Sequence, residues 1–116
     1  MFALVGAGLS REQTSFEVAL LGVVDDGFPI MVECGFTDAF RGRHRIIEKV
    51  PVISDADELV PSVGYVFCEV VHRWTDDDNR DLALVSTELP FYIESTTGQT
   101  EFTLLTEQLL VRRETK

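Results

Sequence analysis

The C-terminal half of this 116-residue chain alternates apolar segments with turn sequences, and that pattern constrains the fold more than any other feature. Segments 63–74, 80–88, 90–95 and 100–114 are rich in aromatic and β-branched residues, which favour strands. The sequences TDDDN and TTGQ lie between them and contain Asp, Asn, Thr and Gly, which favour tight turns. The C-terminal half is therefore predicted to form a four-stranded antiparallel meander.

The segment 11–24 fits two different periodicities. Ser10 and Gln13 match a helix capping box, and the apolar residues that follow recur at helical spacing. The alternation of Phe16, Val18 and Leu20, with the hairpin sequence DDG at 25–27, favours a strand instead. We favour a helix for the first part of 11–24, fraying near Gly22, and a strand is the alternative for this segment. Strands are predicted over 28–36 and 45–54, and a short turn or helix over 54–60.

These elements predict one globular domain over residues 1–116, because a chain of this length supports a single core. The expected class is α+β: an antiparallel β-sheet of about five to six strands with one or two helices packed on one face. An all-β fold is the alternative. On the strand 63–74, one face is expected to meet the core, and it consists of Val66, Cys68, Val70, His72 and Trp74.

Composition argues against several classes of protein. The longest apolar stretches, such as 18–24, are far shorter than the roughly 18 residues that a bilayer crossing needs, so no membrane span is expected. The N-terminal segment is marginal as a signal peptide because it lacks basic residues before its apolar stretch. Cys34 and Cys68 lie in strand-like surroundings and are expected to be buried free thiols. These features together predict a cytoplasmic protein.

Charge is distributed unevenly along the chain. The formal net charge is −10, which disfavours nucleic acid as a direct partner because phosphate binding depends on clustered Lys and Arg. Residues 50–107 contain twelve acidic residues and two basic ones, whereas RGRHR at 41–45 is a basic segment. Such an electrostatic dipole can steer association, so we expect a protein partner with a basic surface.

The acidic sequence DDDNRD at 76–81 could suggest a metal site. An EF-hand loop needs alternating oxygen ligands and a glycine at its sharp turn, and this sequence provides neither. It is predicted to be a hairpin tip, with no metal and no cofactor. The candidate partner-binding residues combine this tip with the basic segment and one aromatic residue: Trp74, Asp76, Asp77, Asp78, Asp81, Arg41, Arg43 and Arg45.

No catalytic residue can be assigned. Cys68 and His72 are four residues apart on a strand and so about 13 Å apart, too far to share a zinc ion. The sequence contains no nucleophile elbow, phosphate loop or dinucleotide fingerprint. The enzyme alternative is a small isomerase or hydratase that uses Glu33 or Glu69 as a buried carboxylate. We expect a binding protein rather than an enzyme.

Residues 70–88, VVHRWTDDDNRDLALVSTE, combine an aromatic strand, an acidic turn and a returning strand. This segment resembles one found in small bacterial immunity-type proteins of polymorphic toxin systems. The resemblance implies a cytosolic α+β domain that binds and neutralises a cognate toxin. The leading hypothesis is thus an acidic inhibitor of the immunity type that binds a basic toxin or enzyme. A structural or oligomerisation module, and hence a homodimer, is a further alternative.

Overall fold

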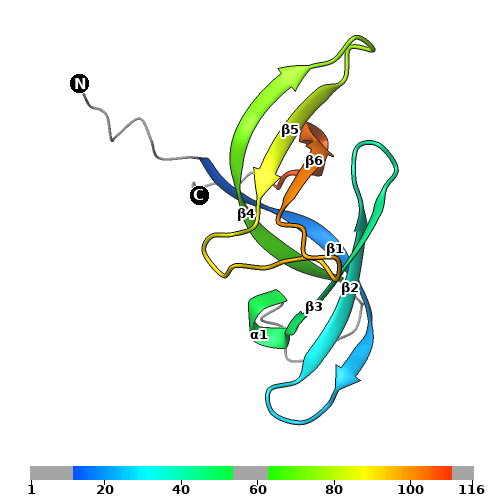
Figure 1. The fold of residues 1–116 in the computed structure, drawn as a ribbon, viewed down its shortest axis with the longest axis vertical. Helices are drawn as coiled ribbons and strands as arrows, with labels where there is room; N and C mark the ends of the chain where they lie inside the picture. The colour runs from blue at the N-terminus through cyan, green and yellow to red at the C-terminus, as the bar shows by residue number, and fades with distance from the viewer. Residues whose placement is uncertain (1–11, 54–62, 111–116) are drawn as a thin grey trace, which may run out of the picture.

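The structure, a computed structural model, describes residues 12–53 and 63–110 (Figure 1). Six strands form one sheet: β1 (Glu12–Asp25), β2 (Met31–Thr37), β3 (Arg43–Lys49), β4 (Val63–Thr75), β5 (Asp81–Ser86) and β6 (Glu101–Leu105). The two helical elements are α1 (Val50–Ile53) and the 3₁₀ turn η2 (Thr106–Gln108). No helix within these described ranges is long and apolar enough to span a bilayer.

The strands follow the order β3-β2-β1-β4-β5-β6, and every neighbouring pair is antiparallel. Strands β1, β2 and β3 are consecutive, and β4 returns to the other side of β1. This arrangement is a Greek key. Strands β5 and β6 then extend the sheet as a meander. The long β4–β5 hairpin and the β1–β2 hairpin therefore project from opposite ends of the molecule (Figure 1).

The sheet curls so that its last strand approaches the hairpin formed by β2 and β3 (Figure 1). The amide of Ala39 donates to the carbonyl of Thr103 in β6 over 2.9 Å. The amide of Thr96, between β5 and β6, donates to the carbonyl of Arg45 in β3 over 2.8 Å. The curled sheet encloses the core, whose largest fully buried side chains include Phe16, Phe102, Ile46, Leu82 and Ile93.

The predicted α+β class is wrong, and the all-β alternative describes the fold. The helix favoured for the first part of 11–24 is wrong, and the strand alternative is confirmed, because Glu12–Asp25 is a strand. Its alternation dominates: Phe16, Val18 and Leu20 are buried, whereas Glu17 and Ala19 between them are exposed. Both edges of β1 find partners, β4 on one side and β2 on the other. Paired backbone on both edges outweighs local helical propensity in this segment.

Other predicted elements also differ from the structure. The strand predicted over 90–95 is a loop, in which Ile93 alone is a buried apolar side chain, so the predicted C-terminal meander has three strands rather than four. The strand predicted over 45–54 is β3 followed by α1, and the one over 100–114 ends at Leu105. The turn or helix predicted over 54–60 lies outside the described residues.

A register shift in β4 changes which side chains reach the core. Val66, Cys68 and Val70 are buried as predicted. Between Val70 and His72 the pairing with β5 shifts, which marks a β-bulge. Beyond this bulge His72 is exposed and Trp74 is half-buried, so the prediction that both face the core is wrong. The bulge turns these two rings toward the surface of the β4–β5 hairpin.

Three turns share one hydrogen-bond pattern: residues 38–42, 76–80 and 95–99. In each, the side-chain oxygen of the first residue accepts from the amides of the third and fifth residues. The first amide donates to the fifth carbonyl, and the fourth amide donates to the first carbonyl. The fourth residue has a positive φ in every case: 70° at Arg41, 66° at Asn79 and 84° at Gly98. Asp38, Asp76 and Ser95 therefore build the same rigid turn.

Candidate functional site

The tip of the β4–β5 hairpin is built by Asp76. Its Oδ1 accepts from the amides of Asp78 and Arg80, each over 2.9 Å. Its Oδ2 accepts from Nε of Arg80, also over 2.9 Å. The amide of Arg80 first, and then its guanidinium, hold the pKa of Asp76 below its ordinary value. Asp76 thus shapes the turn, a role that the sequence could not assign to it because three aspartates are adjacent there.

The remaining acids of the tip are presented to solvent. Asp77, Asp78 and Asp81 are exposed, and Asp81 accepts a hydrogen bond from the hydroxyl of Thr75. On the same hairpin, the rings of His72 and Trp74 stack with centroids 5.3 Å apart and planes 17° apart. Trp74 pairs with Leu82 across the hairpin. The structure therefore brings the predicted acidic residues and Trp74 together at one end of the molecule.

Arg80 joins this acidic tip to the turn between β2 and β3. Its Nη1 donates to the carbonyl of Ala39 over 3.1 Å, and its guanidinium lies 5.8 Å from the centre of the Phe40 ring. Because Arg41 belongs to that second turn, it lies near the acidic hairpin. No sequence pattern indicated this contact, since the two turns are about 40 positions apart.

The three predicted arginines do not form one row. Arg43 and Arg45 are both exposed, two positions apart on β3, as alternation requires. Arg45 donates from Nη1 to Oε2 of Glu33 over 2.8 Å. Arg41 precedes the strand and has a left-handed backbone with φ 70°, so it does not continue the alternation of Arg43 and Arg45. Only Arg41 lies in the turn that Arg80 connects to the acidic tip.

The carboxylates of the enzyme alternative lie on the outer face of the sheet. Glu33 forms the ion pair with Arg45, and its side chain is 31% exposed. Glu69 is half-buried on β4, opposite Gln13 of β1. Both positions alternate with buried cysteines, Cys34 and Cys68, which face the core. Neither glutamate is therefore the core carboxylate that an isomerase-like site would need.

Both cysteines are free and buried. Burial, followed by the nearby carboxylates, raises the pKa of Cys34 to about 11 and that of Cys68 to about 12. Thiols with such pKa values are poor nucleophiles at neutral pH. Across residues 12–53 and 63–110, no group of three or more His, Cys, Asp or Glu side chains is arranged to hold a metal ion.

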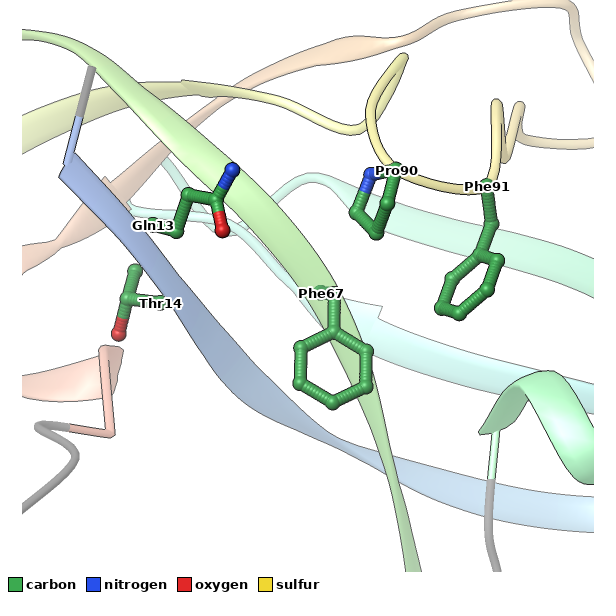
Figure 2. Close-up of a pocket in the computed structure, with 5 residues that line it drawn as sticks. All are labelled: Gln13, Thr14, Phe67, Pro90 and Phe91. Carbon is green, nitrogen blue, oxygen red and sulfur yellow. The ribbon is translucent and has the colours of Figure 1, made fainter. Parts of the chain in front are cut away.

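Two apolar surfaces were missed by sequence reasoning. The first is a pocket of about 240 Å³ lined by Gln13, Thr14, Phe67, Pro90 and Phe91 (Figure 2). Its residues come from β1, β4 and the loop after β5, so sequence proximity could not reveal it. The one local signal is the apolar sequence LPFY at 89–92. Its composition favours a strand, so it did not indicate a loop that lines a pocket.

The second surface is the projecting end of the β1–β2 hairpin. Every residue from 21 to 30 is exposed. The large apolar side chains among them are Leu21, Val23, Val24, Phe28 and Ile30, and the exposed fraction of Phe28 reaches 101%. The sequence DDG at 25–27 predicts a hairpin here. It does not predict that both faces of the hairpin are exposed, because that exposure arises where the hairpin extends beyond the neighbouring strands β3 and β4.

The described surfaces thus comprise an ordered acidic tip with a stacked aromatic pair, an aromatic pocket and an apolar hairpin end. All three belong to one sheet and are presented by hairpins or by the loop after β5. Comparisons of this chain with protein-family models, with curated protein sequences and with solved structures found no match.

Proposed function

We propose that this chain is an acidic protein-binding module that recognises a partner with a basic surface, as inhibitors of the immunity type do. Its contact surface is the end of the β4–β5 hairpin. The observation that carries the proposal is the turn locked by Asp76, which presents Asp77 and Asp78 to solvent beside the His72–Trp74 stack.

A rigid acidic tip suits this role for two reasons. Binding loses less conformational entropy when the contact loop is already ordered, and Asp76 orders this one through three hydrogen bonds. Exposed carboxylates accelerate and orient the encounter with a basic surface. Trp74 adds the kind of half-buried aromatic ring that contributes most binding energy in protein interfaces.

The test compares affinity capture from the native cell with three baits: the unaltered chain, an Asp77→Lys/Asp78→Lys variant and an Asp26→Lys/Glu101→Lys variant. The two variants have the same net charge, and all four substituted residues are exposed. We expect one basic protein to bind the unaltered chain and the Asp26/Glu101 control, and to be lost from the Asp77/Asp78 variant. Titration with purified partner should then show affinity that falls with salt.

The proposal is wrong if no protein is retained, or if the Asp77/Asp78 variant retains it as well as the control does. Trp74→Ala provides an independent check at the same surface. If Trp74 lies in the interface, this substitution weakens binding at least tenfold and leaves the salt dependence unchanged, because it removes no charge.

A second candidate function, self-association, is favoured by the apolar end of the β1–β2 hairpin. Monomers rarely expose large contiguous apolar patches, and here Val24 and Phe28 are 53% and 101% exposed on one hairpin. Sedimentation velocity should show a concentration-dependent dimer that Val24→Lys/Phe28→Lys abolishes and Asp26→Lys retains. A chain that stays monomeric at high micromolar concentration would refute this candidate.

We also propose a cytoplasmic location. The support is the pair of free cysteines, Cys34 and Cys68, since reduced thiols persist in that compartment. Fractionation of the native cell with an antibody against the chain tests this, and recovery in an extracytoplasmic fraction would contradict it.

A further inference from the structure

The pocket beside Phe67 has a fixed shape because the buried residue Thr87 anchors the loop between β5 and β6 through hydrogen bonds. Thr87 is fully buried, its amide donates to the carbonyl of Thr100, and its carbonyl accepts from the amide of Ile93, each over 2.8 Å. The hydroxyl of Thr87 also donates to the carbonyl of Ile93. Since Ile93 is buried in the core, the loop segment that carries Pro90 and Phe91 is held at both ends.

Three rings form the apolar part of this pocket. Figure 2 shows Phe67 on β4 and Pro90 and Phe91 on the loop around one hollow, with Gln13 on the β1 side. The centroids of Phe67 and Phe91 lie 5.9 Å apart with planes inclined at 56°. Both rings remain partly exposed, at 36% and 47%. They can therefore contact a ligand without moving.

The size of the pocket restricts its ligand. Its volume of about 240 Å³ is below the roughly 300–1,000 Å³ of pockets that enclose drug-sized molecules. One or two side chains of an extended peptide fit this volume. Surfaces lined by aromatic rings bind proline-rich and other extended segments, whose backbone remains available to a polar group such as the amide of Gln13.

The segments that carry the pocket's lining residues are acidic. The described segments that surround it, 13–19, 63–69 and 86–94, contain no Lys or Arg. Their acidic residues include Glu17, Glu88 and Glu94. Glu17 lies opposite Tyr65 across β1 and β4, and Tyr65 lies two positions from Phe67 on the same face of β4. Aromatic faces beside carboxylates favour a cationic side chain, through both cation–π attraction and charge.

We propose that this pocket binds an extended segment of a partner protein in which a proline or aliphatic side chain stands next to a lysine or arginine. The apolar side chain inserts between Phe67, Pro90 and Phe91, and the cation lies over the rings toward the carboxylates. This inference rests on the proposed function, since it assumes a basic protein partner, and it assigns recognition to a surface separate from the Asp77–Asp78 tip.

The test uses random hexapeptides displayed on phage and selected against the full chain. We expect the enriched peptides to contain Lys or Arg within two positions of Pro, Leu, Ile or Val. Synthetic versions of these peptides should lose at least tenfold in affinity on Phe91→Ala. Phe28→Ala is the matched control, because it removes the same ring from a position exposed in another hairpin. In spectra of ¹⁵N-labelled protein, the peptides should shift the amides of Gln13, Phe67 and Phe91.

The role of charge is tested with the Glu17→Lys/Glu94→Lys variant. It should bind the same peptides more weakly than the unaltered chain does, and the loss of affinity should grow as salt is lowered. The proposal is overturned if no peptide is enriched, if the enriched peptides lack basic residues, or if Phe91→Ala binds them as the unaltered chain does. The Asp77→Lys/Asp78→Lys variant separates the two proposals, because it should leave peptide binding unchanged. Suppose that the Asp77→Lys/Asp78→Lys variant loses the cellular partner and that the unaltered chain binds no peptide at the pocket. The proposed function then stands and this inference fails.

Discussion

His44 and Asp38 lie 2.7 Å apart, from Nε2 to Oδ2, and their side chains are only 13% and 15% exposed. The imidazole packs against the rings of Phe36 and Phe102, with centroids 5.1 and 4.9 Å away. The other carboxylate oxygen of Asp38 accepts from the amides of Phe40 and Gly42. One carboxylate thus ties the turn between β2 and β3 to the aromatic part of the core.

Because of this contact, the free energy of unfolding should decrease as the pH becomes acidic. Burial would raise the pKa of Asp38, but the hydrogen bonds from His44, Gly42 and Phe40 outweigh it and hold the pKa below 3.8. A depressed pKa means that the ionised form stabilises the fold above about pH 4 and that this contribution is lost as pH falls through the folded-state pKa. Asp38→Asn should cost about 1–2 kcal/mol at pH 7.

Urea unfolding at pH values from 7 to 2 measures this effect. The difference between the unaltered chain and Asp38→Asn should shrink toward zero at the acid end. Asp77→Asn is the control, because it removes the same charge from an exposed position in an equivalent turn and should change stability little. A difference that stays constant with pH would show that the charge of Asp38 contributes nothing.

Replacement of Arg41 by glycine should stabilise the fold. It occupies the left-handed position of its turn with φ 70°, where the equivalent turn at 95–99 has Gly98. A left-handed conformation costs a non-glycine residue about 1–2 kcal/mol, and glycine removes this cost from the folded state. Glycine also makes the unfolded chain more flexible, which lowers stability by only about 0.4–1 kcal/mol. Arg41→Gly should therefore raise the melting temperature, and Gly98→Arg should lower it. A lower melting temperature for Arg41→Gly would mean that the arginine side chain itself stabilises the fold.

The sequence predicted elements well where local chemistry and tertiary pairing agree. The β4–β5 hairpin has β-branched strands on both sides of a turn rich in aspartate, and both its strands and its tip were correctly located. The sequence of segment 11–24 fits both a helix and a strand, and the pairing of β1 with β2 and β4 decides between them. No local signal could supply those partners.

The candidate surfaces were harder to predict than the strands. Asp76 and Asp77 are chemically identical, and only the turn geometry separates the residue that locks the tip from the one that faces solvent. The pocket requires Gln13, Phe67 and Phe91 to meet, which depends on the Greek key and on the buried Thr87. The bulge before His72 reversed the expected direction of Trp74, because strand alternation holds only where pairing is regular.

The two cysteines should resist alkylation in the folded protein. Because burial holds their pKa values near 11 and 12, almost no thiolate is present at pH 8. We expect iodoacetamide to modify neither Cys34 nor Cys68 over hours in native buffer and both within minutes in concentrated urea, as read by mass spectrometry. Thr97→Cys, at an exposed position, is the positive control. Rapid native modification of Cys34 or Cys68 would contradict the burial.

Gly64 of β4 lies against Ile53 of α1. A Cβ atom at this position would collide with Cγ2 of Ile53 and would lie 3.1 Å from both the Ile53 carbonyl oxygen and Cδ2 of Leu20. Ile53 is itself buried, so the side chains cannot move aside into solvent. Gly64→Ala should therefore cost about 1–3 kcal/mol of unfolding free energy through overpacking.

Gly22 provides the matched comparison, because it lies in β1 and a methyl group added there would have no atom within 4 Å. At this position the same substitution should be neutral or should stabilise by about 0.4–1 kcal/mol, since alanine restricts the unfolded chain without a clash. Thermal unfolding of both variants gives the answer. Equal melting temperatures for the two would mean that α1 does not pack against β4 as closely as the Ile53–Gly64 contact requires.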